Sequence, residues 1–169
     1  MGFGSGVSRI AVLLSLLVAS TAFARPPQEG EAIQISRRPW FAICAGVCPN
    51  YHVAVRPDGA VLVLRRNFDS VDEVMSFRVS PARLARFRAI LAAYRPTDDT
   101  PEPSRCEHDV RPEEAALVRD AVEIEVKWTG AAGSDHLVAC DTQENAALRE
   151  AIGAALQSLG IAADGRRRL

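Results

Sequence analysis

The order in which hydrophobic periodicity changes along the chain is the feature that most constrains the fold. Apolar and polar residues alternate in several segments between residues 33 and 79, and helical spacing follows up to Tyr94. Alternation returns from residue 122 to 140, and a second helical pattern ends at Gly160. A period of two is typical of half-buried strands, and one of 3.6 is typical of amphipathic helices. Strands followed by a helix, twice, predict an α+β domain with an antiparallel sheet and two amphipathic helices packed on one face.

The first block predicts several strands and one helix. The expected strands run from Ile33 toward Trp40, over a hairpin at 51–64 turned by Pro57-Asp58-Gly59, and over 74–79. Ser80 is expected to cap the helix and Pro81 to occupy its first position, where the missing N–H costs nothing. The helix should bury a stripe formed by Leu84, Phe87, Ile90, Leu91 and Tyr94.

The second block predicts two strands and a helix. Val122, Ile124, Val126 and Trp128 alternate with charged residues, a turn follows at 130–135, and 136–140 returns. Asp141 with Glu144 three residues later resembles a capping box, so the second helix is expected to open there. Its apolar stripe consists of Leu148, Ile152, Ala155, Leu156 and Leu159.

The N-terminus has the composition of an export signal. One basic residue, Arg9, precedes an uncharged apolar run, and small residues close on Ala22-Phe23-Ala24. This order is typical of a secretory signal peptide, and the run is shorter than the roughly 20 residues that a membrane span requires. We therefore expect residues 1–24 to be removed, the mature protein to be periplasmic or extracellular, and no stable membrane insertion after processing.

The mature chain is expected to form one domain. The expected organisation is a flexible lead-in at 25–31, a single α+β domain at 32–160, and a disordered tail at 161–169. Processing removes one of the 20 basic residues and none of the 21 acidic ones, which leaves a net charge of −2. A nucleic-acid-binding domain usually carries a basic surface, so this balance argues against nucleic acid as a partner.

Four cysteines in an exported chain predict two disulfides, for which three connectivities exist. We favour Cys44 with Cys48 and Cys106 with Cys140, so the domain is expected to be disulfide-stabilised. A redox role for the first pair is the alternative, because small-ring disulfides are often reducible. Three residues separate these cysteines, and the next element is expected to be a strand, whereas a thioredoxin-like motif places two residues between its cysteines and opens a helix.

A metal site is one hypothesis for the histidines, because His52, His108 and His136 each lie near a cysteine in the sequence. Their spacing does not match common zinc patterns, and oxidation of the thiols would remove zinc ligands. No metal, no cofactor and no catalytic residue is therefore predicted. A serine hydrolase is not supported either, because no G-x-S-x-G motif is present.

A proline-rich acidic stretch begins after the first helix and is expected to form a long surface loop. Long loops on a rigid scaffold often carry recognition, although a purely solvated loop is the alternative. The predicted partner-binding residues in this loop are Asp98, Asp99, Glu102, Glu107 and Asp109.

The string Cys44-Ala45-Gly46-Val47-Cys48-Pro49-Asn50-Tyr51, of pattern C-x-G-x-C-P-x-Y, resembles the opening of an uncharacterised bacterial domain-of-unknown-function family of exported proteins. The apolar helix stripe at 84–94, followed by Asp98 and Asp99, is similar to the middle of that family. The resemblance covers roughly residues 33–100 and implies a fold and an exported location, without an activity.

Together these patterns predict a non-catalytic envelope domain that binds an unidentified protein or small ligand. The alternative is an exported enzyme or metal-binding protein that uses the cysteine and histidine positions. Oxidation state separates the two, because disulfides leave no thiolates for metal binding or nucleophilic attack.

Overall fold

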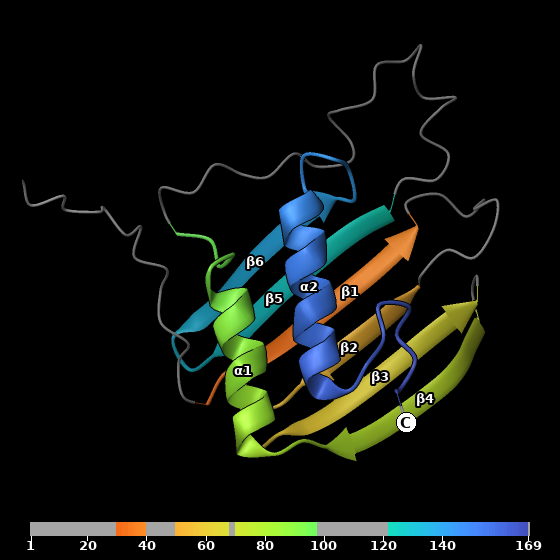
Figure 1. Cartoon of the computed structure of the whole chain (residues 1–169). Helices are drawn as coiled ribbons and strands as arrows, with labels where there is room; N and C mark the ends of the chain where they lie inside the picture. The colour runs from red at the N-terminus through yellow and green to blue at the C-terminus, as the bar shows by residue number, and fades with distance from the viewer. Residues whose placement is uncertain (1–29, 40–49, 68–69, 98–121, 169) are drawn as a thin grey trace, which may run out of the picture.

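The computed structural model describes residues 30–39, 50–67, 70–97 and 122–168, which form a six-stranded antiparallel sheet with two helices on one face (Figure 1). This arrangement confirms the α+β prediction. The strand order is β4-β3-β2-β1-β5-β6, so β4 and β6 are the edges of the sheet. The elements are β1 (Ala32–Pro39), β2 (Tyr51–Val55), β3 (Ala60–Asn67), β4 (Ser70–Arg78), α1 (Pro81–Ala92), β5 (Val122–Gly130), β6 (Gly133–Cys140) and α2 (Ala146–Leu159).

The first strand joins the two sequence blocks into one sheet. Ile35 in β1 lies opposite Val53 of β2 on one side and Val126 of β5 on the other. Because these three residues share one face, the register directs the apolar alternation of both blocks toward the helices. The hairpin 51–64 and the strands at 122–140 are confirmed, although β6 starts earlier than predicted, at Gly133.

The core lies between this face and the two helices. Phe87 and Leu91 of α1 and Ala155 and Leu156 of α2 are completely buried. Burial of one large apolar side chain contributes roughly 1.5–3 kcal/mol, so the two helical stripes account for much of the packing energy. No helix in the described ranges is long and apolar enough to span a membrane.

The first helix begins as predicted and the second does not. Ser80 Oγ accepts a hydrogen bond from Arg83 N at 3.4 Å, and Pro81 occupies the first turn of α1. The capping box predicted at Asp141 is wrong, because α2 begins at Ala146 after Asn145. Asp141 instead forms ion pairs with two arginines, which are described below. Its carboxylate therefore does not cap the helix.

Residues 161–168, assigned above to a disordered tail, form a C-terminal turn on the helix side of the sheet (Figure 1). Ile161 pairs with Arg167 in an isolated bridge and is completely buried. Gly165 is also buried and has a φ of +81°, and a Cβ there would lie 3.0 Å from the ring of Tyr51. The C-terminal turn is therefore packed directly on β2.

A buried charge network connects the start of β1 to the end of α1. The Arg95 Nη1 and Nη2 groups donate to the two Glu31 carboxylate oxygens at 3.1 and 2.7 Å, and Arg95 Nε donates to Asp135. The side chains of Glu31 and Arg95 are 1% and 5% exposed. Glu31 was assigned above to a flexible lead-in, and this network holds it in place.

Gly59 gives the β2–β3 hairpin a conformation that other residues rarely adopt. Its φ is +81°, and a Cβ at this position would lie 2.8 Å from the backbone oxygen of Val79. We expect Gly59→Ala to lower the free energy of unfolding by about 2 kcal/mol, because a strained turn is combined with a backbone clash.

Urea denaturation would measure this effect, and Gly153→Ala in α2 is the matched control. The control should raise stability slightly, because Gly153 is helical and no described atom lies within 4 Å of its added Cβ. Equal effects of the two substitutions would contradict the prediction.

Candidate functional site

The candidate site is a small cavity between α2, the sheet and the C-terminal turn. Its volume is about 130 Å³, which suits a ligand of only a few heavy atoms. Two guanidinium groups and a phenol face an otherwise apolar lining. The lining residues are Arg37, Tyr51, Ile124, Arg149, Ile152, Gly153 and Ala163.

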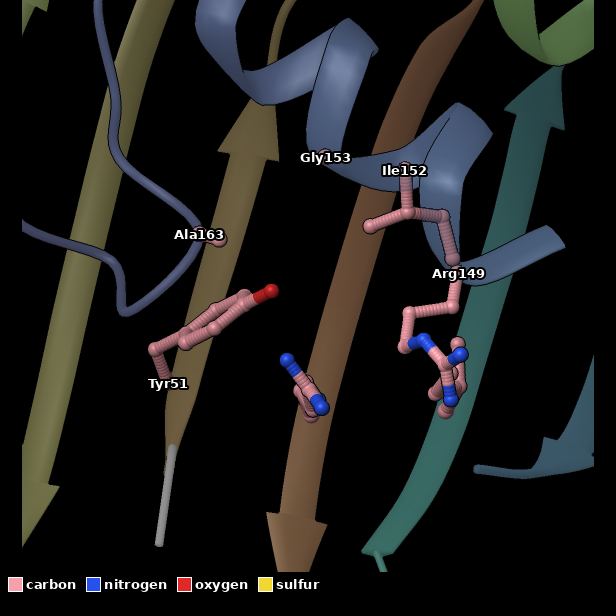
Figure 2. Close-up of a pocket in the computed structure, with 7 residues that line it drawn as sticks. Tyr51, Arg149, Ile152, Gly153 and Ala163 are labelled. Carbon is pink, nitrogen blue, oxygen red and sulfur yellow. The ribbon is translucent and has the colours of Figure 1, made fainter. Parts of the chain in front are cut away.

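Strand register and helix spacing bring these residues together. Arg37 continues the helix-facing series of β1, and it lies opposite Tyr51 of β2 and Ile124 of β5. Arg149 precedes Ile152 by three residues on α2, so both share one side of the helix. Figure 2 shows the Tyr51 ring rising from β2 below Ala163, while the Arg149 side chain descends from α2 toward the sheet.

Asp141, at the end of β6, holds both arginines. Its Oδ2 accepts from Arg37 Nη2, and its Oδ1 accepts from Arg149 Nη1 at 2.7 Å. The Asp141 side chain is 9% exposed, so these charge-assisted bonds are partly shielded from water. Two positive groups share one negative group, which leaves a formal charge of +1 among the three side chains.

One donor in this cluster has no acceptor in the described structure. The Arg37 Nε atom is buried and has no hydrogen-bond partner among the described residues. A buried polar group left unpaired costs about 1–3 kcal/mol, and more when the group is charged. An acceptor that entered the cavity close to Arg37 would remove this cost.

Tyr51 contributes a neutral hydroxyl. Burial raises the pKa of Tyr51 to about 12, while the charge of Arg37 and a hydrogen bond with its side chain act in the opposite direction. The phenol therefore stays protonated at physiological pH and keeps its O–H. Its ring is fixed by contact with the C-terminal turn at Gly165.

The remaining wall is apolar. Ile124 and Ile152 are almost completely buried, and Gly153 contributes no side chain to the cavity. A ligand with one charged end and a short aliphatic end would place the charge near Arg37 and Arg149 and the carbon atoms against the two isoleucines.

The structure bears on few of the site residues predicted from the sequence. Cys44, Cys48 and Cys106 lie outside the described residues, and Cys140 is buried at the end of β6. The predicted disulfides therefore stay predictions. The partner-binding loop also lies outside the described residues, and this applies to Asp98, Asp99, Glu102, Glu107 and Asp109.

Two histidines lie on the helix-free face of the sheet, and His108 lies outside the described residues. His52 Nδ1 is 2.9 Å from Ser36 Oγ, and His136 Nε2 is 2.8 Å from Glu125 Oε1. Burial lowers the pKa of His52, with Arg66 acting in the same direction and Glu125 against it. Within the described ranges, no three His, Cys, Asp or Glu residues are arranged to hold a metal ion.

Neither arginine of the cavity was predicted from the sequence. Arg37 had a recognisable signal, because it continues the alternation of Ile33 and Ile35 onto the buried face. A charged residue at a position of this kind needs a partner. Arg149 gave no such signal, since an arginine beside an apolar stripe is common on helix surfaces.

No family model and no curated protein matches the sequence.

Proposed function

We propose that the protein is an exported, non-catalytic domain that binds a small carboxylate in the cavity between α2 and the sheet. The observation that carries this proposal is the excess of guanidinium over carboxylate at the site, together with the buried, unpaired Nε atom of the half-buried Arg37. A planar guanidinium matches the geometry of a carboxylate, and the two can form parallel hydrogen bonds.

The size and polarity of the cavity support a short organic acid as the ligand. Pockets for drug-sized ligands measure roughly 300–1,000 Å³, so a cavity of about 130 Å³ favours a ligand with a short chain. Ile124 and Ile152 would contact its methyl or methylene groups. The neutral Tyr51 hydroxyl would donate to a carboxylate oxygen.

Asp141 gives the proposed site a defined orientation. It holds Arg37 from the sheet and Arg149 from the helix, so their guanidinium groups are already oriented before a ligand arrives. Preorganisation of this kind reduces the entropy lost on binding. Asp141 also limits affinity, because the ligand has to share both arginines with it.

The test is a titration with acetate and butyrate, followed by backbone amide NMR. We expect shifts centred on Tyr51, Arg149 and Gly153, with a dissociation constant in the millimolar range. A dissociation constant of about 1 mM corresponds to a binding free energy of about −4.1 kcal/mol. This is weaker than the limit of about −6 kcal/mol that is reached by the best ligands of four heavy atoms. Butyrate should bind more tightly than acetate, because each buried methylene contributes about 0.8 kcal/mol.

A neutral ligand and a pair of variants test whether binding depends on charge. Acetamide has nearly the shape of acetate without its charge, and it should produce no comparable shifts. Arg149→Gln should weaken acetate binding by about tenfold or more, since a hydrogen bond to a charged group contributes about 1.5–3 kcal/mol. Arg86→Gln, an exposed position on α1, is the matched control and should leave binding unchanged. Equal shifts with acetate and acetamide, or no shifts at the cavity, would refute the proposal.

A protein partner for the acidic loop remains a separate proposal. The export of the chain and the two disulfides are likewise proposals, and they rest on the signal sequence and the even cysteine count. An export location would place the carboxylate site outside the cytoplasm.

A further inference from the structure

Gly153 is a glycine that the helix around it does not need. It lies in the interior of α2, where glycine is less favourable than alanine because its backbone loses more conformational freedom on folding. Gly59 and Gly165 have a positive φ and a close neighbour, whereas the backbone of Gly153 is helical and no described atom lies within 4 Å of a Cβ built on it. Neither backbone conformation nor packing therefore explains a glycine at this position.

The space beside Gly153 belongs to the cavity. Gly153 lines the cavity and follows Arg149 by four residues, so both lie on the same side of α2. Ala163 also lines the cavity, and Figure 2 shows Gly153 on α2 and Ala163 on the C-terminal turn, with the Tyr51 ring rising toward them from β2. A side chain at position 153 would therefore extend into the cavity.

The exposure of the lining residues shows where the cavity opens. Tyr51, Ile124 and Ile152 are between 1% and 3% exposed and form its closed end. Gly153 is half-buried and Ala163 is exposed, so the cavity reaches the surface between α2 and the C-terminal turn. The two smallest residues of the lining therefore lie at this opening.

We propose that Gly153 is the specificity-determining residue of the cavity, and that its missing side chain admits carboxylates with an aliphatic chain as long as that of butyrate. This inference rests on the proposed function, because it names which carboxylates the site accepts. In a cavity of about 130 Å³, a methyl group at position 153 would take the place of one ligand carbon, so acetate would still fit and butyrate would fit only in part. A leucine side chain has as many carbon atoms as butyrate and would exclude both acids.

Titration of Gly153→Ala with acetate and butyrate tests the proposal, with the amide shifts of Tyr51 and Arg149 as the readout. Butyrate binding should weaken by about fourfold, which is the contribution of one buried methylene, while acetate binding should stay within about twofold of that of the parent protein. The same variant should have a higher urea midpoint, because alanine is the better helix residue. A gain in stability together with a selective loss of butyrate binding is not expected from a damaged fold.

Gly153→Leu should abolish detectable binding of both acids, and Ala154→Leu is the matched control. Ala154 is exposed on the same helix and receives the same side chain, so both affinities should stay unchanged in this control. Circular dichroism and urea denaturation would establish that each variant is folded. Butyrate affinities of Gly153→Ala and Gly153→Leu equal to that of the parent protein would overturn this inference and leave the proposed function standing.

A neutral probe separates failure of this inference from failure of the proposed function. If the parent protein binds neither acid, the proposed function fails, and xenon then tests the role of Gly153 alone, because it enters small protein cavities without carrying a charge. Xenon under pressure should shift the amides of Tyr51 and Arg149 in the parent protein, and Gly153→Leu should lose these shifts. An absence of shifts in the parent protein, or equal shifts in both proteins, would then overturn the inference.

Discussion

Replacing Arg95 with methionine should lower the free energy of unfolding by about 3–5 kcal/mol. The substitution would leave the Glu31 carboxylate buried without the two guanidinium hydrogen bonds that it accepts now. It would also remove the Arg95 bond to Asp135 on β6. A single buried charge costs more than a buried pair, because the attraction that offset its desolvation is lost.

A double variant separates the contribution of the ion pair from that of the packing of the Arg95 carbon atoms. Glu31→Gln combined with Arg95→Met removes both charges and should recover most of the loss. Arg86→Met on the exposed side of α1 is the matched control and should change stability by less than about 0.5 kcal/mol. Urea denaturation with linear extrapolation would measure all three variants. A loss for Arg95→Met no larger than that of the control would contradict the prediction.

The location of this network explains why its effect should be large. Arg88 Nη2 donates to the backbone oxygen of Glu31 at 2.8 Å, so an arginine of α1 also holds this residue, in addition to Arg95 beyond the helix. Glu31 immediately precedes β1, which is the strand that connects both halves of the sheet. Loss of the network should therefore destabilise β1 and, through it, the strands that pair on both of its sides.

Much of the fold could be predicted from the sequence because apolar alternation and helical stripes report directly on burial. Ile33 and Ile35, Val53 and Val55, and the α1 stripe all lie where their spacing placed them. Strand order could not be predicted in the same way. Nothing in the spacing of β1 indicates that it lies between β2 and β5, since that depends on pairing between distant segments.

The candidate site was harder to predict because it depends on contacts between residues far apart in the chain. Arg37 and Asp141 are separated by 104 positions and still form an ion pair. Local pattern suggested a capping role for Asp141, since an acidic residue before a helix usually serves the helix N-terminus. In the structure Asp141 pairs with two arginines and does not cap the helix. No local feature of the sequence indicates that these distant residues reach its carboxylate.

Replacing Cys106 and Cys140 together with alanine should lower the free energy of unfolding by about 4 kcal/mol, if the predicted pairing is correct. The reason is the ring that this disulfide would close, of about 35 residues, which restricts the unfolded chain more than the small ring of Cys44 and Cys48. Replacing the latter pair should cost about 2 kcal/mol, and it is the matched comparison. Both variants are measured by urea denaturation under non-reducing conditions.

The position of Cys140 adds a second expected effect of the same substitution. Cys140 is 3% exposed at the end of β6, and the next residue is Asp141, which holds the two arginines of the cavity. A disulfide at Cys140 would therefore fix the segment that orients Arg37 and Arg149. The Cys106 and Cys140 variant should bind acetate more weakly than the Cys44 and Cys48 variant, under conditions where both are folded. Peptide mapping that links Cys140 to Cys44 or Cys48 would refute the pairing, and equal losses of stability would refute the argument from ring size.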